Sequence, residues 1–346
     1  MRIVNYILGA LLVAGVCACS DDEIFEQSPS ERNEQSIAAL REELVSAPHG
    51  WKMIYFPKTD SLLFSDPNAK VGEFDYQPKS FSYGGKYFIM KFDSEGQVTM
   101  YADDDEQCVS TPMVGKYRVD QNSMTQLSFT TYNYIHSLVN NAFGGACDFL
   151  YAGKDHLGNM LFKTFNYLEP AREYILFEKL EQDPQEGEFL KKSLKNRSYF
   201  ENMVNPQITI SKGDRIYFMS DRYLKYYQGS DGIGDWEKGS RDHRYYVFLY
   251  NKKLNPIPDR YPLEVNALGS GYVGTETGLT FRSGIRYSKD YIFYHFKREG
   301  NSFVSELVKV YDPITRKTFY AEKELYPDGE FTGLKAVIEN KPIVMN

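Results

Sequence analysis

The strongest constraint on the fold is a series of short apolar segments separated by turn-forming residues. Segments 87–92 and 97–101 flank Asp93-Ser94-Glu95-Gly96, which predicts a β-hairpin. Similar patterns predict two more hairpins, one formed by 116–119 with 125–129 and one by 149–152 with 160–165. Two single strands are predicted over 51–56 and 172–178. Turn signals at this spacing favour an antiparallel meander, either a sandwich or a partly open barrel.

A helix is predicted before the first strand. Ser28 can cap it, Pro29 suits its first position, and Glu31 completes a capping box. Three apolar residues then follow at helical spacing on one face, namely Ile37, Leu40 and Leu44. The segment 47–50 contains Pro and Gly and ends the helix.

The second half returns to strands after a linker. Residues 182–187 are polar with Pro and Gly, and the spacing of apolar residues over 189–200 predicts a short amphipathic helix. Strands are expected over 207–210, 215–219, 244–250, 280–282, 291–296 and 303–311. The predicted fold is therefore mainly β with minor α. It has an N-terminal helix and two antiparallel β-meander lobes, over 28–180 and 206–346, joined by a helical linker over 181–205.

The N-terminus has the pattern of an export signal. One basic residue, Arg2, precedes the nearly continuous apolar run 3–16, which is too short for a membrane span. The run ends in Val16-Cys17-Ala18-Cys19 and resembles a lipobox. We therefore predict a signal peptide over 1–18, lipidation of Cys19 and a tether over 19–27. Several acyl chains on Cys19 would then anchor the protein to a lipid bilayer. The alternative is an ordinary secretory signal with a cysteine near its end.

The four residues after Cys19 are polar and acidic, Ser20-Asp21-Asp22-Glu23. They resemble the signal that sends Bacteroidota lipoproteins to the outer face of the outer membrane. That resemblance implies exposure on the cell surface, and a solvated tether is the simpler alternative.

Composition limits the partners. The net charge is −7, and loss of Arg2 with the signal peptide would make it −8, so nucleic acid is not an expected partner. The chain has 28 Tyr and 23 Phe, which suit β-strands and could also offer stacking surfaces.

Outside the cytoplasm Cys108 and Cys147 could form a disulfide, or both could stay unpaired.

Several stretches resemble the Bacteroidota lipoproteins of domain-of-unknown-function family 4302, and the likeness covers most of the mature chain. These stretches are the lipobox and residues 48–52, 88–93, 96–101 and 130–136. Residues 277–281 resemble the family more weakly. The resemblance implies an accessory surface lipoprotein. Such lipoproteins are often encoded beside outer-membrane nutrient importers of the SusC and SusD type, and sometimes beside a zinc metallopeptidase. The resemblance implies no catalytic residues in this chain.

Motifs for catalysis and cofactors give little support to an enzyme. Residues 269–274 match G-x-G-x-x-G, but the segment that follows is a poor helix start, so we expect a flexible β-connection there. The five His are scattered, and the sequence has no H-E-x-x-H, G-x-S-x-G or P-loop motif. We predict a non-enzymatic protein without a cofactor. A site assembled from distant residues is not visible in one sequence.

Two acidic segments, 103–106 and 230–237, could supply oxygen ligands for Ca²⁺. The candidate ligands in the second are Asp231, Asp235 and Glu237. Neither segment has the EF-hand spacing, and solvated loops are the favoured interpretation of both.

The candidate ligand-contact residues are Trp236, which lies in a polar, Gly-rich loop, and Tyr226 and Tyr227, which come shortly before it. Exposed aromatic rings stack on sugars, and binding residues concentrate in loops. Trp51 is instead predicted to lie in the core.

The favoured function is a cell-surface accessory protein that binds an oligosaccharide, a peptide or importer components. The alternatives are a secreted hydrolase with a site assembled from distant residues, and a structural or adhesion component.

Overall fold

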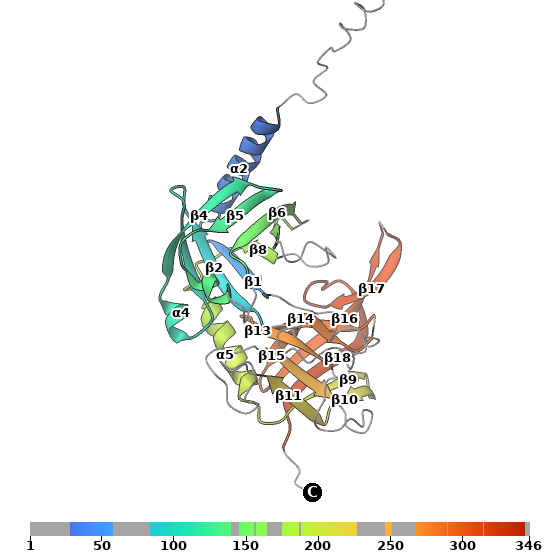
Figure 1. The fold of residues 1–346 in the computed structure, drawn as a ribbon. Helices are drawn as coiled ribbons and strands as arrows, with labels where there is room; N and C mark the ends of the chain where they lie inside the picture. The colour runs from blue at the N-terminus through green and yellow to red at the C-terminus, as the bar shows by residue number, and fades with distance from the viewer. Residues whose placement is uncertain are drawn as a thin grey trace, which may run out of the picture.

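The computed structural model describes residues 28–57, 84–139, 145–155, 157–164, 175–186, 188–226, 246–250, 268–288, 290–313 and 315–342. They form two β-rich lobes, a closed eight-stranded barrel and a ten-stranded sheet. The chain enters through α2 at one end of the molecule and leaves at the opposite end (Figure 1). Strands are antiparallel in both lobes. The predicted mainly β, antiparallel fold is confirmed.

Helix α2 (Pro29–Val45) begins as its sequence predicts. The Ser28 hydroxyl accepts the Glu31 N–H, and the Glu31 carboxylate accepts the Ser28 N–H at 2.8 Å. Leu40 and Leu44 are buried against the barrel. The Trp51 indole N–H donates to the carbonyl of Leu44 at 2.8 Å and so fixes the end of the helix against the first strand.

The first lobe is a closed meander rather than a partly open one, because its last strand, β8, pairs with its first, β1. Its strands are β1 (Trp51–Tyr55), β2 (Lys86–Phe92), β3 (Gln97–Ala102), β4 (Met113–Gln121), β5 (Thr125–Phe129), β6 (Asp148–Lys154), β7 (Met160–Lys163) and β8 (Ile175–Lys179). The turn at residues 93–96 joins β2 to β3, as predicted.

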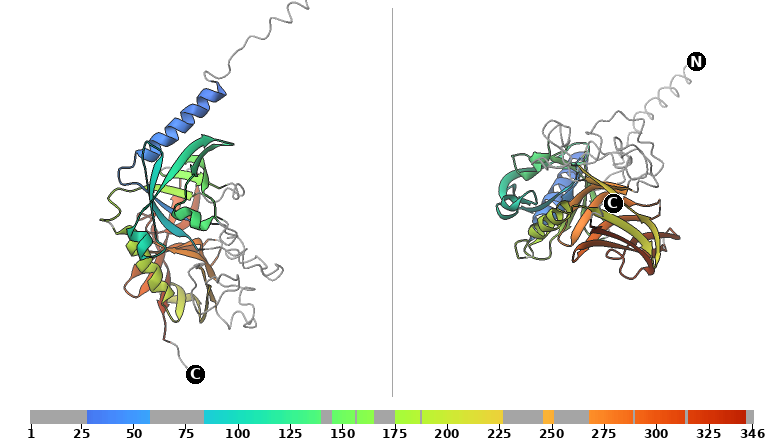
Figure 2. Two further views of the ribbon diagram at one scale, coloured as in Figure 1. Left: turned by 60° about the vertical axis from the view of Figure 1, so that its left-hand side comes forward. Right: turned by 90° about the horizontal axis from the view of Figure 1, so that it is seen from below.

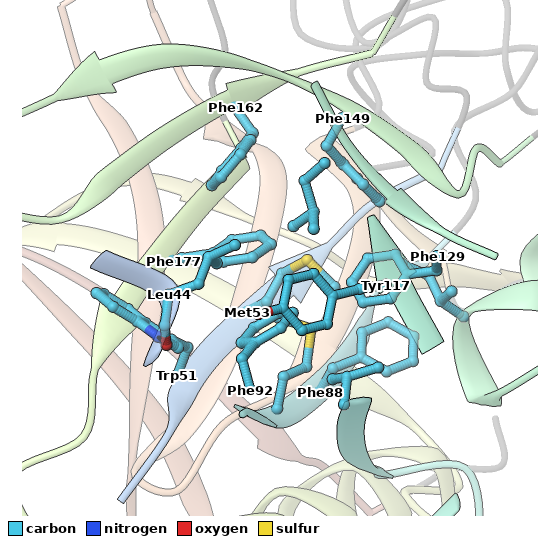
Figure 3. Close-up of a cluster of buried hydrophobic side chains, with 14 of the residues drawn as sticks. Leu44, Trp51, Met53, Phe88, Phe92, Tyr117, Phe129, Phe149, Phe162 and Phe177 are labelled. Carbon is cyan, nitrogen blue, oxygen red and sulfur yellow. Dashed lines mark hydrogen bonds between the residues drawn. The ribbon is translucent and has the colours of Figure 1, made fainter. Parts of the chain in front are cut away.

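Aromatic side chains fill the barrel (Figure 3). The Phe149 ring meets the rings of Tyr55, Phe129 and Phe177 edge-on, with centroids 5.4, 5.9 and 6.4 Å away. Trp51, Met53 and Phe88 are fully buried in the same cluster, so Trp51 is a core residue as predicted. The barrel interior is therefore a packed core.

Two short helices are inserted between barrel strands, and the sequence analysis did not predict either. They are α4 (Glu106–Ser110), between β3 and β4, and the 3₁₀ helix η3 (Tyr134–Leu138), between β5 and β6. Asp105 caps α4 through the Cys108 N–H, and Asn133 caps η3 through the Ile135 N–H. Short polar caps of this kind are easily mistaken for ordinary loop residues.

Helix α5 (Phe189–Glu201) follows the barrel and packs on the second sheet (Figure 2). The sheet comprises β9 (Pro206–Lys212), β10 (Arg215–Met219), β11 (Arg222–Tyr226), β12 (Tyr246–Tyr250), β13 (Leu268–Gly274), β14 (Gly278–Arg286), β15 (Ile292–Glu299), β16 (Ser302–Asp312), β17 (Lys317–Glu322) and β18 (Glu330–Asn340). Phe200 joins α5 to the core of this lobe through edge-on contacts with Tyr272 and Phe303.

The flexible connection expected at 269–274 is wrong, because this segment is part of β13. Tyr272 and Val273 are fully buried there, and Tyr272 pairs with Phe281 of β14. A Cβ at Gly274 would lie 2.2 Å from the carbonyl oxygen of Ser193, so this glycine allows α5 to approach the strand. Gly274 thus serves packing, and the segment is a strand rather than a phosphate-binding turn.

Strands β11, β17 and β18 were not predicted. β18 lies between β9 and β16, so the strand order in this lobe departs from chain order.

None of the helices formed by the described residues is both long and apolar enough to cross a membrane.

Candidate functional site

Most of the predicted site residues lie outside the described part of the chain, namely Cys19, Tyr227, Asp231, Asp235, Trp236 and Glu237. The backbone of Tyr226 is described, and it ends β11 opposite Tyr246 of β12. The proposed sugar contact and Ca²⁺ ligands of this loop therefore remain predictions. Within the described ranges, no three His, Cys, Asp or Glu side chains are grouped closely enough to hold a metal ion.

Cys108 and Cys147 are both free thiols, so the unpaired alternative describes the structure. Cys108 lies in α4, and Cys147 precedes β6. Burial raises the pKa of Cys108 to about 11 and also raises the pKa of Cys147. A thiol with a raised pKa is a poor nucleophile at neutral pH, so neither cysteine has the environment of a reactive thiolate.

The acidic segment 103–106 is only partly the solvated loop that the sequence favoured, because Asp105 and Glu106 are exposed but Asp103 is not. Asp103 is fully buried and accepts hydrogen bonds from the Tyr87 N–H at 2.9 Å, the Ser193 hydroxyl at 2.8 Å and the Arg197 guanidinium at 3.1 Å. Burial raises the pKa of Asp103, while Arg197, Tyr87 and Ser193 oppose that rise. These partners are distant in sequence, which is why the segment alone suggested a solvated loop.

Exposed aromatic residues gather instead at the end of the second sheet, on and around the hairpin of β16 and β17, which projects from the sheet (Figure 1). Tyr311 is 61 % exposed and Leu325 is 60 % exposed, while Phe319 and Tyr326 are each 38 % exposed. Tyr311, Leu325 and Tyr326 line a groove of about 650 Å³, which we call the aromatic groove. Contiguous exposed apolar surface of this kind marks interaction sites.

The path of β16 produces this groove. β15 pairs with residues 302–304 of β16, and β17 pairs with residues 307–312, so β16 extends beyond its first partner. The turn after β17 folds back, with the Tyr326 N–H donating to the Glu322 carbonyl and the Gly329 N–H to the Tyr326 carbonyl. A Cβ at Gly329 would lie 2.4 Å from a methyl carbon of Val308, so glycine lets this turn close on β16.

Glu322 fastens the hairpin to the rest of the sheet. One of its carboxylate oxygens accepts the His295 N–H at 2.7 Å and also the N–H of Tyr294. Burial raises the pKa of Glu322, and the two backbone donors and His295 oppose the rise. The carboxylate therefore holds β17 against β15 where these strands share no ladder.

Polar groups border the aromatic rings of the groove. Phe319 and Tyr326 meet edge-on with their centroids 5.5 Å apart, which fixes the Tyr326 ring. Lys309 pairs with Glu330 at 3.2 Å across the groove wall. Asp328 and Thr318 add further hydrogen-bonding groups to the lining. Fixed aromatic faces beside hydroxyl, carboxylate and ammonium groups suit a ligand with both apolar faces and hydroxyl groups. No signal used in the sequence analysis pointed to this groove, because β17 and β18, which flank β16 there, were not predicted.

The protein is two-lobed and mainly β. One lobe is a closed antiparallel barrel, and the other is a ten-stranded antiparallel sheet that carries the aromatic groove. The chain belongs to the family described as domain of unknown function DUF4302, whose model matches residues 21–300. The family resemblance seen in the sequence is thus confirmed. The groove residues follow residue 300 and lie outside the matched segment. No curated protein and no solved structure matches the chain.

Proposed function

We propose that this chain is a non-enzymatic, cell-surface accessory lipoprotein that is anchored through acylated Cys19 and binds an oligosaccharide in the aromatic groove. In this proposal it supports nutrient uptake beside an outer-membrane importer of the SusC and SusD type. The observation that carries the binding role is the cluster of exposed aromatic side chains lining the groove. The anchor rests on the sequence alone.

The physical argument for a sugar starts from the rings. Water solvates an exposed aromatic ring poorly, and a sugar ring offers an apolar face of C–H groups that can cover it. The Tyr326 ring is already held by Phe319, so stacking on it costs little side-chain entropy. Asp328, Glu330 and Lys309 can exchange hydrogen bonds with sugar hydroxyls around the stack.

The groove predicts a specific loss of affinity. A glycan array with the mature chain from Ser20 onward should identify an oligosaccharide, and calorimetry should then show that Tyr326→Ala weakens binding at least tenfold, about 1.4 kcal/mol. Tyr311→Ala should act in the same direction. Tyr132→Ala is the matched control, because Tyr132 is 66 % exposed but lies on the barrel lobe. Absence of any bound glycan, or an equal loss in the control, would contradict the proposal.

The anchor predicts a change in where the protein partitions. Cys19→Ala should move the protein from the membrane fraction to the soluble fraction, because the acyl chains that hold it in the bilayer can no longer be attached. Cys17→Ala is the control and should leave the protein in the membrane fraction. Cell fractionation with detergent phase separation measures both variants. Retention of the Cys19→Ala protein in membranes would show that lipid on this residue is not the anchor.

A further inference from the structure

Helix α4 of the barrel faces α5 at the seam between the two lobes (Figure 1). A second cleft lies between these helices. Its volume is about 910 Å³, and α4, α5 and β15 all contribute to its lining. The apolar part of the lining consists of Val109, Leu194 and Tyr199. We call it the seam cleft. Ligand sites often form at such boundaries between lobes, and this volume falls in their usual range of roughly 300–1,000 Å³.

Buried contacts beneath the cleft hold its two walls in place. Arg197 of α5 reaches across to the segment before α4, where it pairs with the Asp103 carboxylate at 3.1 Å and donates to the Asp104 carbonyl at 3.0 Å. Val109 of α4 and Leu190 of α5 belong to one buried apolar cluster. A site whose walls are already fixed loses less entropy when a ligand binds.

The Tyr199 side of the cleft is fixed in the same way. The Arg298 guanidinium lies 3.8 Å from the centroid of the Tyr199 ring, and the Tyr199 hydroxyl donates to the Asn301 carbonyl at 3.2 Å. Arg298 also donates to the Asn196 side chain at 3.3 Å. One positive charge is thereby held at the edge of the apolar lining.

The two walls carry opposite charges. Lys191 and Lys195, one helical turn apart on α5, line the same side as Arg298, while Asp105 and Glu106 line the α4 side. Lys191 has one long, exposed ion pair, with Glu188 at 3.7 Å. Within the described ranges, neither Lys195 nor Glu106 takes part in an ion pair. These two charges can therefore meet a ligand without breaking an existing bridge.

We infer that the seam cleft binds a peptide segment that carries basic and acidic side chains on either side of an apolar residue. Its basic groups would face Asp105 and Glu106, its acidic groups would face Lys191 and Lys195, and its apolar side chain would cover Leu194 and Val109. A polyanion would be repelled by the α4 wall and a polycation by the α5 wall. A neutral sugar would leave both sets of charges unused. This site is independent of the aromatic groove.

Three sets of six-residue peptides test this inference: Lys-Lys-X-X-Glu-Glu with apolar X, and two matched sets in which all four charged residues are Lys or all are Glu. Fluorescence anisotropy with the mature chain should give a Kd below about 1 mM for the mixed-charge set. Both single-sign sets should bind at least tenfold more weakly. Rising salt should weaken the mixed-charge complex, since the contacts are near the surface.

Charge-reversal variants locate the binding. Lys195→Glu and Glu106→Lys should each weaken the mixed-charge complex at least tenfold. The double variant should not restore it, because Lys191, Arg298 and Asp105 keep their charges and each wall then carries both signs. Lys91→Glu is the control for Lys195→Glu, since it changes the net charge by the same amount at the one exposed position of β2. Equal binding of all three peptide sets would overturn the inference, as would no binding below millimolar concentration or equal losses in the Lys91→Glu control. Thermal unfolding of each variant verifies that it is folded.

Discussion

Replacing Arg197 with Met should lower the free energy of unfolding by about 3–5 kcal/mol, because it leaves the Asp103 carboxylate buried without its counter-charge. Both side chains are almost fully shielded from water, at 2 % and 0 % exposure. Met keeps the length and most of the volume of the arginine stem, so the loss would come mainly from the charge and its hydrogen bonds. Urea unfolding followed by far-UV circular dichroism measures the change.

Two further variants separate the buried charge from a general effect of losing an arginine. Arg197→Met combined with Asp103→Asn should recover part of the lost stability, because the amide oxygen can still accept the Tyr87 N–H without a charge. Arg118→Met removes a mostly exposed ion pair with Asp120 and should cost no more than about 1 kcal/mol. If Arg197→Met proves no worse than Arg118→Met, the buried pair does not stabilise the seam between the lobes.

Trp51→Ala should lower the free energy of unfolding by about 3–5 kcal/mol, the usual range for removing a large aromatic side chain from a core. Trp51 is fully buried where α2 meets the barrel, and its indole N–H bonds the Leu44 carbonyl at 2.8 Å. The substitution removes both the packing and the bond that ends α2 against β1. Urea unfolding followed by circular dichroism is suitable, because it does not depend on tryptophan emission.

The matched variants for this position are Trp51→Phe and Val114→Ala. Trp51→Phe keeps much of the buried area but loses the hydrogen bond, so it should fall between the wild type and Trp51→Ala. Val114 is 60 % exposed on β4, and its truncation should change stability by no more than about 0.5 kcal/mol. A Trp51→Ala effect as small as that of Val114→Ala would show that the contact between α2 and the barrel contributes little.

Turns and helices that depend only on neighbouring residues could be predicted from the sequence. The turn between β2 and β3 was found because Asp93 accepts the Glu95 and Gln97 N–H groups, an interaction contained within five residues. Helix α5 was found from its own apolar spacing. The aromatic groove was missed because β17 and β18 were not recognised, and the Phe319 and Tyr326 rings meet only when the turn after β17 folds back.

The sequence by itself determined the class of the fold, the start of α2, the core position of Trp51 and the family. Each of these depends on short-range patterns, whether alternation, capping or a local motif. Only the tertiary structure decided that β1 closes on β8, that β18 inserts between β9 and β16, and that Asp103 is buried. The physical reason is distance along the chain: Asp103 meets Ser193 and Arg197 about ninety residues later. Until folding brings such partners together, an acidic segment looks the same whether it will face water or an arginine.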